Sequence, residues 1–383
     1  MAGAETAAAV PVPLLSRPPE EGVRLLGLKF LDQAAAAQLR LDAADANDAN
    51  DANAAADAAD AADDPEGGEA LHDFRVALRR LRSCLDAYAE VLADSLSKKL
   101  RKRLRRLAAA TGGGRDAEVQ IEWLRREAPP TAAAQRPGYA WLLARLAKRK
   151  REAYAALQEE VREDFSRLAA DLRGRLSVYK TEVHLERDFP RRTLGTVAAA
   201  VLREQVANLA EHLARIETAD DERQAHRARI RAKRLRYLLE PFRGEVPGEA
   251  GRELTKVVER LKELQDLLGE LHDAHVLEGE LREALGRAAV EQVEKLFDLT
   301  LQGSADPRLT SALRRRRAEP GLLAVANQNR RRRDRLFAEL SSGWLEGRAA
   351  GLLERAAGLA ASLTGPTGPT GETGLTKEER GSG

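Results

Sequence analysis

Two stretches of sequence decide the fold: HDFRVALRRLR at residues 72–82 and HRARIRAKRLR at residues 226–236. At an offset of 154, His72 aligns with His226, Arg75 with Arg229 and Arg79 with Lys233. A second pair follows in the same order, LRRLAAATGGGRDAEV at 104–119 and LKELQDLLGELHDAHV at 261–276, at an offset of 157. Two ordered matches with nearly equal offsets indicate that the chain is an internal duplication of one helical unit.

Each stretch predicts an amphipathic helix with a cationic row opposite its core side. At about 100° per residue, the basic residues of the first motif lie within about 80° of His72. The apolar residues of that motif lie on the opposite side and predict a core seam; they are Phe74, Leu78, Leu81 and Leu85. In the second motif Leu235 and Leu239 take the core side, and the same angles recur for His226, Arg229, Lys233 and Arg236.

Neither row has carboxylates on its own face to offset the repulsion between like charges, which costs a few tenths of a kcal/mol per pair. Because this unfavourable row of like charges occurs twice, the sequence predicts that a bound anion neutralises it. Arginine suits phosphate oxygens because its planar fork donates two parallel hydrogen bonds. A third basic helix is predicted at 98–107, where KKLRKRLRRL places three leucines on one side and basic residues over the rest.

Composition agrees with an all-helical chain that binds a polyanion. The 383 residues are 43% hydrophobic, only 4% aromatic and 32% charged, which favours long helices rich in Ala, Leu, Arg and Glu. Residues 41–70 hold ten acidic residues and no Lys or Arg, so removing them from the net charge of +2 leaves +12 on the rest. Near-neutral net charge therefore does not argue against an anionic partner.

At these motifs the chain resembles the CHAD family, the conserved histidine α-helical domain. HDFRVALRRLR, HRARIRAKRLRYLLE and LKELQDLLGELHDAHV carry the resemblance, which covers about residues 20–361. It implies an all-α fold of two similar helical bundles, related by a pseudo-two-fold, around a basic surface. It also implies polyphosphate binding and association with polyphosphate granules, with granule proteins as further partners. From the sequence itself we expect a cytoplasmic protein with no cofactor, no metal and no catalytic residue.

The domain expectation that follows has a first half at 20–190, with a disordered acidic insertion at 42–69, and a second half at 191–363. The ends at 1–19 and 364–383 are expected to be disordered, since they lack large apolar residues in a periodic pattern. No run of about 18 apolar residues predicts a membrane span.

The expected polyphosphate ligands combine both rows and the third basic helix. They are His72, Arg75, Arg79, Arg80, Arg82, Lys98, Lys99, Arg101, Lys102, Arg105, Arg106, His226, Arg229, Lys233, Arg234 and Arg236.

Two other functions stay open on the sequence alone. The first is nucleic-acid binding. It is disfavoured because the rows have no aromatic residues beside them on which bases could stack, and because the sequence contains no compact motif for reading bases, such as a helix-turn-helix. The second is a metal-dependent phosphohydrolase using His272 and Asp273, against which stands the lack of an acid–base pair or carboxylate cluster. The repeat partner of that pair, Arg115-Asp116, keeps only the Asp, which favours a structural role for both carboxylates.

Overall fold

The computed structural model describes residues 12–54, 65–178, 192–301 and 317–364, and all regular structure in these ranges is helical. The all-α class is therefore confirmed. The main helices are α1 (Pro19–Ala54), α2 (Pro65–Ala87), α3 (Lys98–Ala110), α4 (Gly113–Glu127), α5 (Arg136–Ser177), α6 (Leu194–Leu213), α7 (Glu222–Leu239), α8 (Gly248–Leu301), α10 (Glu319–Leu340) and α11 (Arg348–Leu363). Short turns of other helix types are η1 (Leu14–Ser16), η2 (Ala133–Gln135), η3 (Glu240–Phe242) and η4 (Ser341–Leu345).

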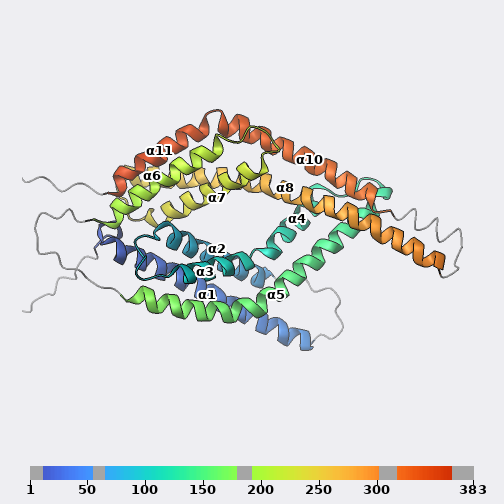
Figure 1. The fold of residues 1–383 in the computed structure, drawn as a ribbon, viewed down its shortest axis with the longest axis horizontal. Helices are drawn as coiled ribbons and strands as arrows, with labels where there is room; N and C mark the ends of the chain where they lie inside the picture. Colours follow the sequence, from blue (N-terminus) through green and yellow to red (C-terminus); the bar gives the residue numbers. More distant parts are fainter. Residues whose placement is uncertain (1–11, 55–64, 179–191, 302–316, 365–383) are drawn as a thin grey trace, which may run out of the picture.

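The molecule is elongated, and the first and second parts of the chain lie against each other along its length (Figure 1). Helices α1, α2, α3 and the end of α5 pack together, as do α6, α7, α11 and the start of α8. Helix α2 contacts α7 and α1 contacts α6, so the halves meet through the helices that carry the two cationic rows. Beyond them, α4, the start of α5, the middle of α8 and α10 form a narrower region.

The hydrophobic core forms two clusters, and each draws on both halves of the chain. The larger cluster runs from α1 and α2 through α6, α7 and the first part of α8 to α11. The smaller one joins Trp123 and Leu124 of α4 and Leu142 of α5 to Leu277 of α8 and Leu322 of α10. Because neither half buries its apolar residues alone, the halves are expected to fold as one cooperative unit. The pseudo-two-fold relation between them stays a prediction.

Helix α2 has the predicted orientation. Its apolar residues Phe74, Leu78, Leu81 and Leu85 are at most 1% exposed, and the Phe74 ring packs edge-on against Phe165 of α5 at 5.0 Å between centroids. In α7, the core side consists of small residues and leucines, namely Ala225, Ala228, Ala232, Leu235 and Leu239. Alanines permit close approach of neighbouring helices, so α7 packs closely against α6 and α8.

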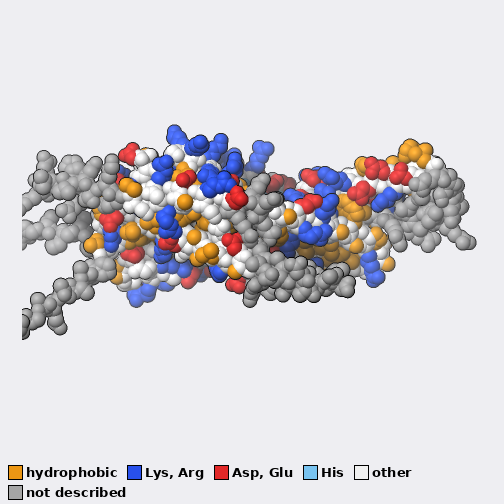
Figure 2. Space-filling view, turned by 90° about the horizontal axis from the view of Figure 1, so that it is seen from below, with side chains coloured by type: hydrophobic (Ala, Val, Ile, Leu, Met, Phe, Trp, Pro, Cys, Tyr) orange, Lys and Arg blue, Asp and Glu red, His pale blue; other side chains and the backbone are white. Residues whose placement is uncertain are grey.

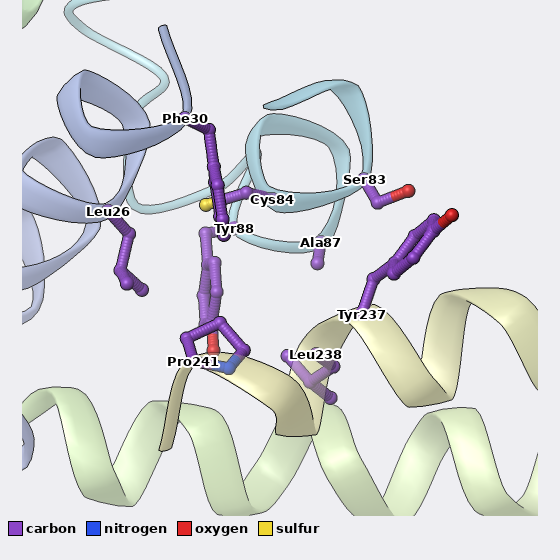
Figure 3. Close-up of a pocket in the computed structure, with 9 residues that line it drawn as sticks. All are labelled: Leu26, Phe30, Ser83, Cys84, Ala87, Tyr88, Tyr237, Leu238 and Pro241. Atoms are coloured by element: carbon purple, nitrogen blue, oxygen red, sulfur yellow. The ribbon is translucent and has the colours of Figure 1, made fainter. Parts of the chain in front are cut away.

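The junction between the halves contains a small cavity beside Cys84 and Tyr88 (Figure 3). Leu26 and Phe30 of α1 line it on one side, and Pro241 of η3 lines it on another. Figure 3 shows the Tyr88 ring extending from the end of α2 toward Pro241. The Tyr88 hydroxyl is buried without a hydrogen-bond partner among the described residues, and burial raises the pKa of the Cys84 thiol to about 12. Cys84 is thus protonated and shielded, which fits a structural role.

Two segments that the sequence predicts to be disordered include described residues with regular structure or long-range contacts. Within residues 12–18, the Leu14 amide donates to a carboxylate oxygen of Glu245 at 2.9 Å, and the Leu194 amide donates to the Arg17 carbonyl at 2.8 Å. These long-range bonds anchor the segment to the second half, which no local pattern shows.

The acidic insertion is also helical where it is described, in α1 up to Ala54 and in α2 from Pro65. Its alanines have the highest helix propensity of all residues, so the helix continues without large apolar side chains to pack. Residues 55–64, together with the ends at 1–11 and 365–383, lie outside the described residues.

Candidate functional site

The basic side chains of the α2 row differ in their exposure to solvent. Arg75 is only 5% exposed; its Nε donates to the carbonyl of Thr111 at the end of α3, and its guanidinium lies 5.4 Å from the centre of the Tyr154 ring. Arg79, one turn further, is half-buried, and its Nε donates to the Arg75 carbonyl at 3.0 Å. Arg75 therefore connects α2 to the α3–α4 junction, whereas part of the Arg79 guanidinium can still bind a ligand.

The α2 and α7 rows face each other across the junction of the halves. Burial, and after it the guanidiniums of Arg79, Arg229, Arg236 and Arg82, lower the pKa of Lys233 to about 7. The pKa of Arg79 is lowered first by burial and also by Arg75, Arg229 and Arg82, against an opposite effect of Tyr237. Groups shift each other's pKa in this way only when they are close, so the two rows are brought together.

Four of these groups have no carboxylate ion-pair partner within the described ranges: Arg79 and Arg82 of α2, and Arg229 and Lys233 of α7. We call these four residues the cationic surface. All four are half-buried, so water screens their mutual repulsion only partly. The arrangement is electrostatically unfavourable for the free protein and favourable for one that holds an anion.

Two other predicted ligands already have an internal partner. Glu240, just after α7, pairs with Arg236 and, at 3.1 Å, with Arg80 of α2. The Nε of Arg236 also donates to Gln265 of α8 at 3.0 Å. One carboxylate thus links the two halves beside the cationic surface and reduces the positive charge that Arg80 and Arg236 offer.

The two predicted histidines lie in different surroundings. His72 is exposed, and burial together with Arg115, Arg79 and Arg75 lowers its pKa, against Asp73. His226 is half-buried, with its Nδ1 at 3.3 Å from Nδ1 of His272. Burial and Arg229 lower the pKa of His226, and burial lowers that of His272 to about 4. All three imidazoles are therefore mainly neutral at pH 7 and can contribute hydrogen bonds rather than charge.

The third basic helix extends this region. Lys98, Lys99, Lys102, Arg105 and Arg106 of α3 are exposed, and Arg101 is half-buried, above a buried side of Leu100, Leu104 and Leu107. Arg105 and Arg82 both lower the pKa of Arg234, which burial lowers most, so α3 continues the cationic surface past α7.

Figure 2 shows Lys and Arg side chains gathered along one edge of the molecule, over the part of its length that α3 occupies in Figure 1. One of these α3 residues, Arg106, also lies 3.8 Å from Asp164 of α5.

Two arginines outside the predicted set also reach the site. Arg115 lies near His72 and Asp273, and Arg332 lies near Asp273 with its guanidinium 5.1 Å from the centre of the Trp123 ring. The sequence signal for Arg332 is the basic run at 330–333, but the next residue, Arg333, points elsewhere and pairs with Asp220 and Glu278 at 2.9 and 3.0 Å. A run of four arginines cannot show which member faces a site.

The carboxylates at the repeated Asp position approach one another. Burial raises the pKa of Asp273, Asp116 raises it further, and Arg229, Arg332 and Arg115 oppose the rise. The described residues contain no group of three or more His, Cys, Asp or Glu side chains that could hold a metal ion. Three arginines thus lie near Asp273, and the structural role of both carboxylates stays a prediction.

The all-helical fold, in which two basic helices meet at the junction of the halves, defines an all-α class of protein. The chain belongs to the CHAD domain family, whose model matches residues 35–282. It is similar to the crystal structure of the CHAD domain from the plant Ricinus communis, with 22% sequence identity and a TM-score of 0.51. The match covers 93% of this chain and 96% of the Ricinus communis chain. It is also similar to PptA from Streptomyces chartreusis, with 18% sequence identity and a TM-score of 0.47. This match covers 88% of this chain and 99% of the PptA chain.

These likenesses to solved structures concern the fold. No curated protein matches the chain. None of the helices in the described ranges is long and apolar enough to cross a membrane.

Proposed function

We propose that this protein binds inorganic polyphosphate on the cationic surface without hydrolysing it, and that it associates with polyphosphate granules by this binding. The carrying observation is that Arg79, Arg82, Arg229 and Lys233 face one another from two helices with no carboxylate ion-pair partner in the described part of the chain. A polyphosphate chain supplies a negative charge at each phosphate, so one extended ligand can neutralise all four groups.

The basic residues of α3 extend the region that a long polyphosphate chain could contact. Arg105 connects the cationic surface to the exposed lysines and arginines of α3 through its proximity to Arg234. A short anion would compensate only part of this charge, whereas a long one can follow it. Binding should therefore strengthen with chain length and weaken with salt, because each neutralised phosphate releases counterions.

The family resemblance seen in the sequence supports the same ligand. The chain is a CHAD domain protein, and its motif residues occupy the helices that form the cationic surface. Among the described residues, the aromatic rings beside the site already lie against guanidiniums: Tyr154 against Arg75 at 5.4 Å, Tyr237 against Arg236 at 4.7 Å and Trp123 against Arg332 at 5.1 Å. These rings therefore leave less free surface on which a base could stack. These features favour polyphosphate over nucleic acid.

The direct test is titration with fluorescent long-chain polyphosphate of the wild type and of the triple variant R79Q/R229Q/K233Q. Arg75 is left intact because it holds the α3–α4 junction. The matched control is R203Q/R252Q/K256Q, which removes the same three charges from exposed positions. We expect the triple variant to lose at least about 3 kcal/mol of binding, or more than 100-fold, at about 1 kcal/mol per charge-assisted contact. Equal affinities of the two variants, with circular dichroism unchanged, would reject the site.

Competition and turnover measurements separate the other functions. Long-chain polyphosphate should displace bound DNA or RNA at much lower concentration than the reverse; efficient displacement by nucleic acid would favour the alternative ligand. Incubation of polyphosphate with Mg²⁺ or Mn²⁺ and the protein should release no phosphate. Release that disappears on His272→Ala would instead support a phosphohydrolase. Cosedimentation with polyphosphate granules, lost in the triple variant, tests the granule association.

A further inference from the structure

The last turns of α8 carry a row of exposed apolar residues that the proposed function does not use. Val290, Val293, Phe297 and Leu301 are each between 55% and 70% exposed. At about 100° per residue, these side chains lie within about 80° of one another on the helix. We call these four residues the apolar stripe. Exposed apolar residues are usually scattered singly, so four of them in one row indicate a contact surface.

The apolar stripe lies on the side of α8 that faces away from the smaller core cluster. The α8 residues of that cluster are on the opposite side of the helix; they are Leu277, Leu281, Ala284 and Ala288. After Ala288, none of the α8 side chains that the structure describes is buried. Figure 1 shows these turns extending beyond α4 and α10 at one end of the molecule. The stripe therefore contributes nothing to the core of its own chain.

Charged residues beside the apolar stripe indicate which partner it fits. Arg287 and Asp298 lie on the same flank of the stripe, three turns apart; both are exposed, and neither forms an ion pair with another described residue. When two identical helices pair antiparallel about a two-fold axis, the same flank of each helix meets. Arg287 of each copy then lies opposite Asp298 of the other, and the pairing is centred near Val293. A parallel pair would instead set these charges against Ala289 and Thr300, which are neutral.

The same register also packs the apolar residues. Val290 of one copy lies between Val293 and Phe297 of the second copy, and Phe297 meets Val290 and Gly286. A Cβ added at Gly286 would have no neighbour within 4 Å, so the outer side of α8 has open space for an aromatic ring there. One antiparallel arrangement therefore pairs the charges and covers the apolar side chains together.

We propose that the apolar stripe is a self-association surface, on which a second copy of this chain docks the end of its own α8 in antiparallel orientation. The contact is short, because about five turns of each helix bury roughly 800–1,000 Å² in total, at the low end for specific interfaces. The dimer should accordingly be weak, with a dissociation constant of about 10–200 μM.

The dimer would carry two cationic surfaces, a consequence that rests on the proposed function. Figure 1 shows the end of α8 lying away from α2 and α7, so polyphosphate and a second copy use different parts of the molecule. A dimer can therefore hold two polyphosphate chains together. Many copies bound along such chains would in turn raise the local protein concentration and favour the dimer.

The experiment is sedimentation velocity of the full-length protein without ligand, at concentrations from about 2 to 500 μM, which span the expected dissociation constant. The wild type should pass from monomer to dimer, whereas V293E/F297E should stay monomeric with unchanged circular dichroism, because it places charges at the centre of the contact. The matched control V12E/L39E introduces the same charges at residues of similar exposure and should associate like the wild type. A monomeric wild type at the highest concentration, or association of V293E/F297E, would refute the surface.

Charge exchange tests the antiparallel register. R287D and D298R alone should each weaken association by about tenfold, since like charges replace both ion pairs. The double variant R287D/D298R should restore it to within about threefold of the wild type. Equal association of the two single variants and the wild type would overturn the register and the choice of partner that rests on it.

Another occupant is tested by replacing residues 302–316, which follow the apolar stripe in the chain, with a Gly-Ser linker of equal length. This variant should associate like the wild type. Dimers that appear only after the replacement would show that this segment covers the stripe in place of a second copy, and would overturn the proposal.

Because association is measured without polyphosphate, the two proposals fail separately. A wild type that binds polyphosphate but stays monomeric refutes self-association and leaves the proposed function standing. A wild type that dimerises through α8 but does not bind polyphosphate supports self-association and refutes the proposed function.

Discussion

Polyphosphate binding should take up a proton at Lys233, and this makes affinity depend on pH in a defined direction. In the free protein the pKa of Lys233 is about 7. A bound polyanion favours the charged amine, so the pKa rises in the complex toward the ordinary value of about 10.4. Protonation therefore supports binding fully below pH 7, and this support is lost as the pH rises above 7.

The size of the effect follows from this linkage. Between the free and bound pKa values, affinity can fall at most about tenfold per pH unit for one proton. Partial exposure of Lys233 to water screens the interaction, so we expect a fall of about three- to twentyfold between pH 6.5 and pH 8.5. In the free protein the pKa values of the nearby His72, His226 and His272 are all lowered, whereas that of Lys233 lies inside this window.

The assay is fluorescence anisotropy with long-chain polyphosphate at constant ionic strength from pH 6.5 to pH 8.5. Lys233→Arg is the matched variant because a guanidinium stays charged throughout. Its affinity should stay nearly constant over the range in which that of the wild type falls. A wild-type affinity that is flat or that rises with pH would refute the reasoning, as would a Lys233→Arg variant with the wild-type pH dependence.

Three further predictions concern neighbouring contacts. Glu240→Gln should free Arg80 and Arg236 to bind phosphate, which should raise polyphosphate affinity at low salt by about 1 kcal/mol in isothermal titration. The same change should lower the free energy of unfolding in urea by about 1–3 kcal/mol, because the two arginines lose their partner. Weaker polyphosphate binding would contradict the account. Gly321→Ala should cost about 1–3 kcal/mol in urea unfolding, because a Cβ there would overlap backbone atoms at the start of α5; unchanged stability would refute this packing. Tyr88→Phe removes a buried hydroxyl without a described partner and should leave the free energy of unfolding equal or raise it by up to about 1 kcal/mol, and a clear loss would show that this hydroxyl has a partner.

The sequence predicts the helices and their faces because both depend on local periodicity. Phe74, Leu78 and Leu81 face the core as the pattern requires, and Leu235 does so in the second motif. The nearness of the two rows could also be predicted, since a duplicated motif with uncompensated charge has a simple explanation only if one anion meets both copies. In the structure α2 contacts α7, and Arg79 is among the groups that lower the pKa of Lys233.

The site details that the sequence does not show all depend on contacts between residues far apart in the chain. Arg75 has the same pattern as Arg79, but the α3–α4 junction folds over it. Glu240 lies outside the aligned motif and takes part in the site only because α2 passes beside the end of α7. Arg332 comes from a separate helix, α10. No local periodicity reports such contacts.

The salt dependence of polyphosphate binding tests the central proposition most directly, because its slope reports how many phosphates the protein neutralises. For an extended single-stranded polyanion the slope of log K against log salt changes by about 0.7 for each contact. Between 50 and 300 mM salt, R79Q/R229Q/K233Q should therefore have a slope smaller than that of the wild type by about 2, while R203Q/R252Q/K256Q keeps the wild-type value. Equal slopes for all three proteins would show that phosphates do not lie between α2 and α7.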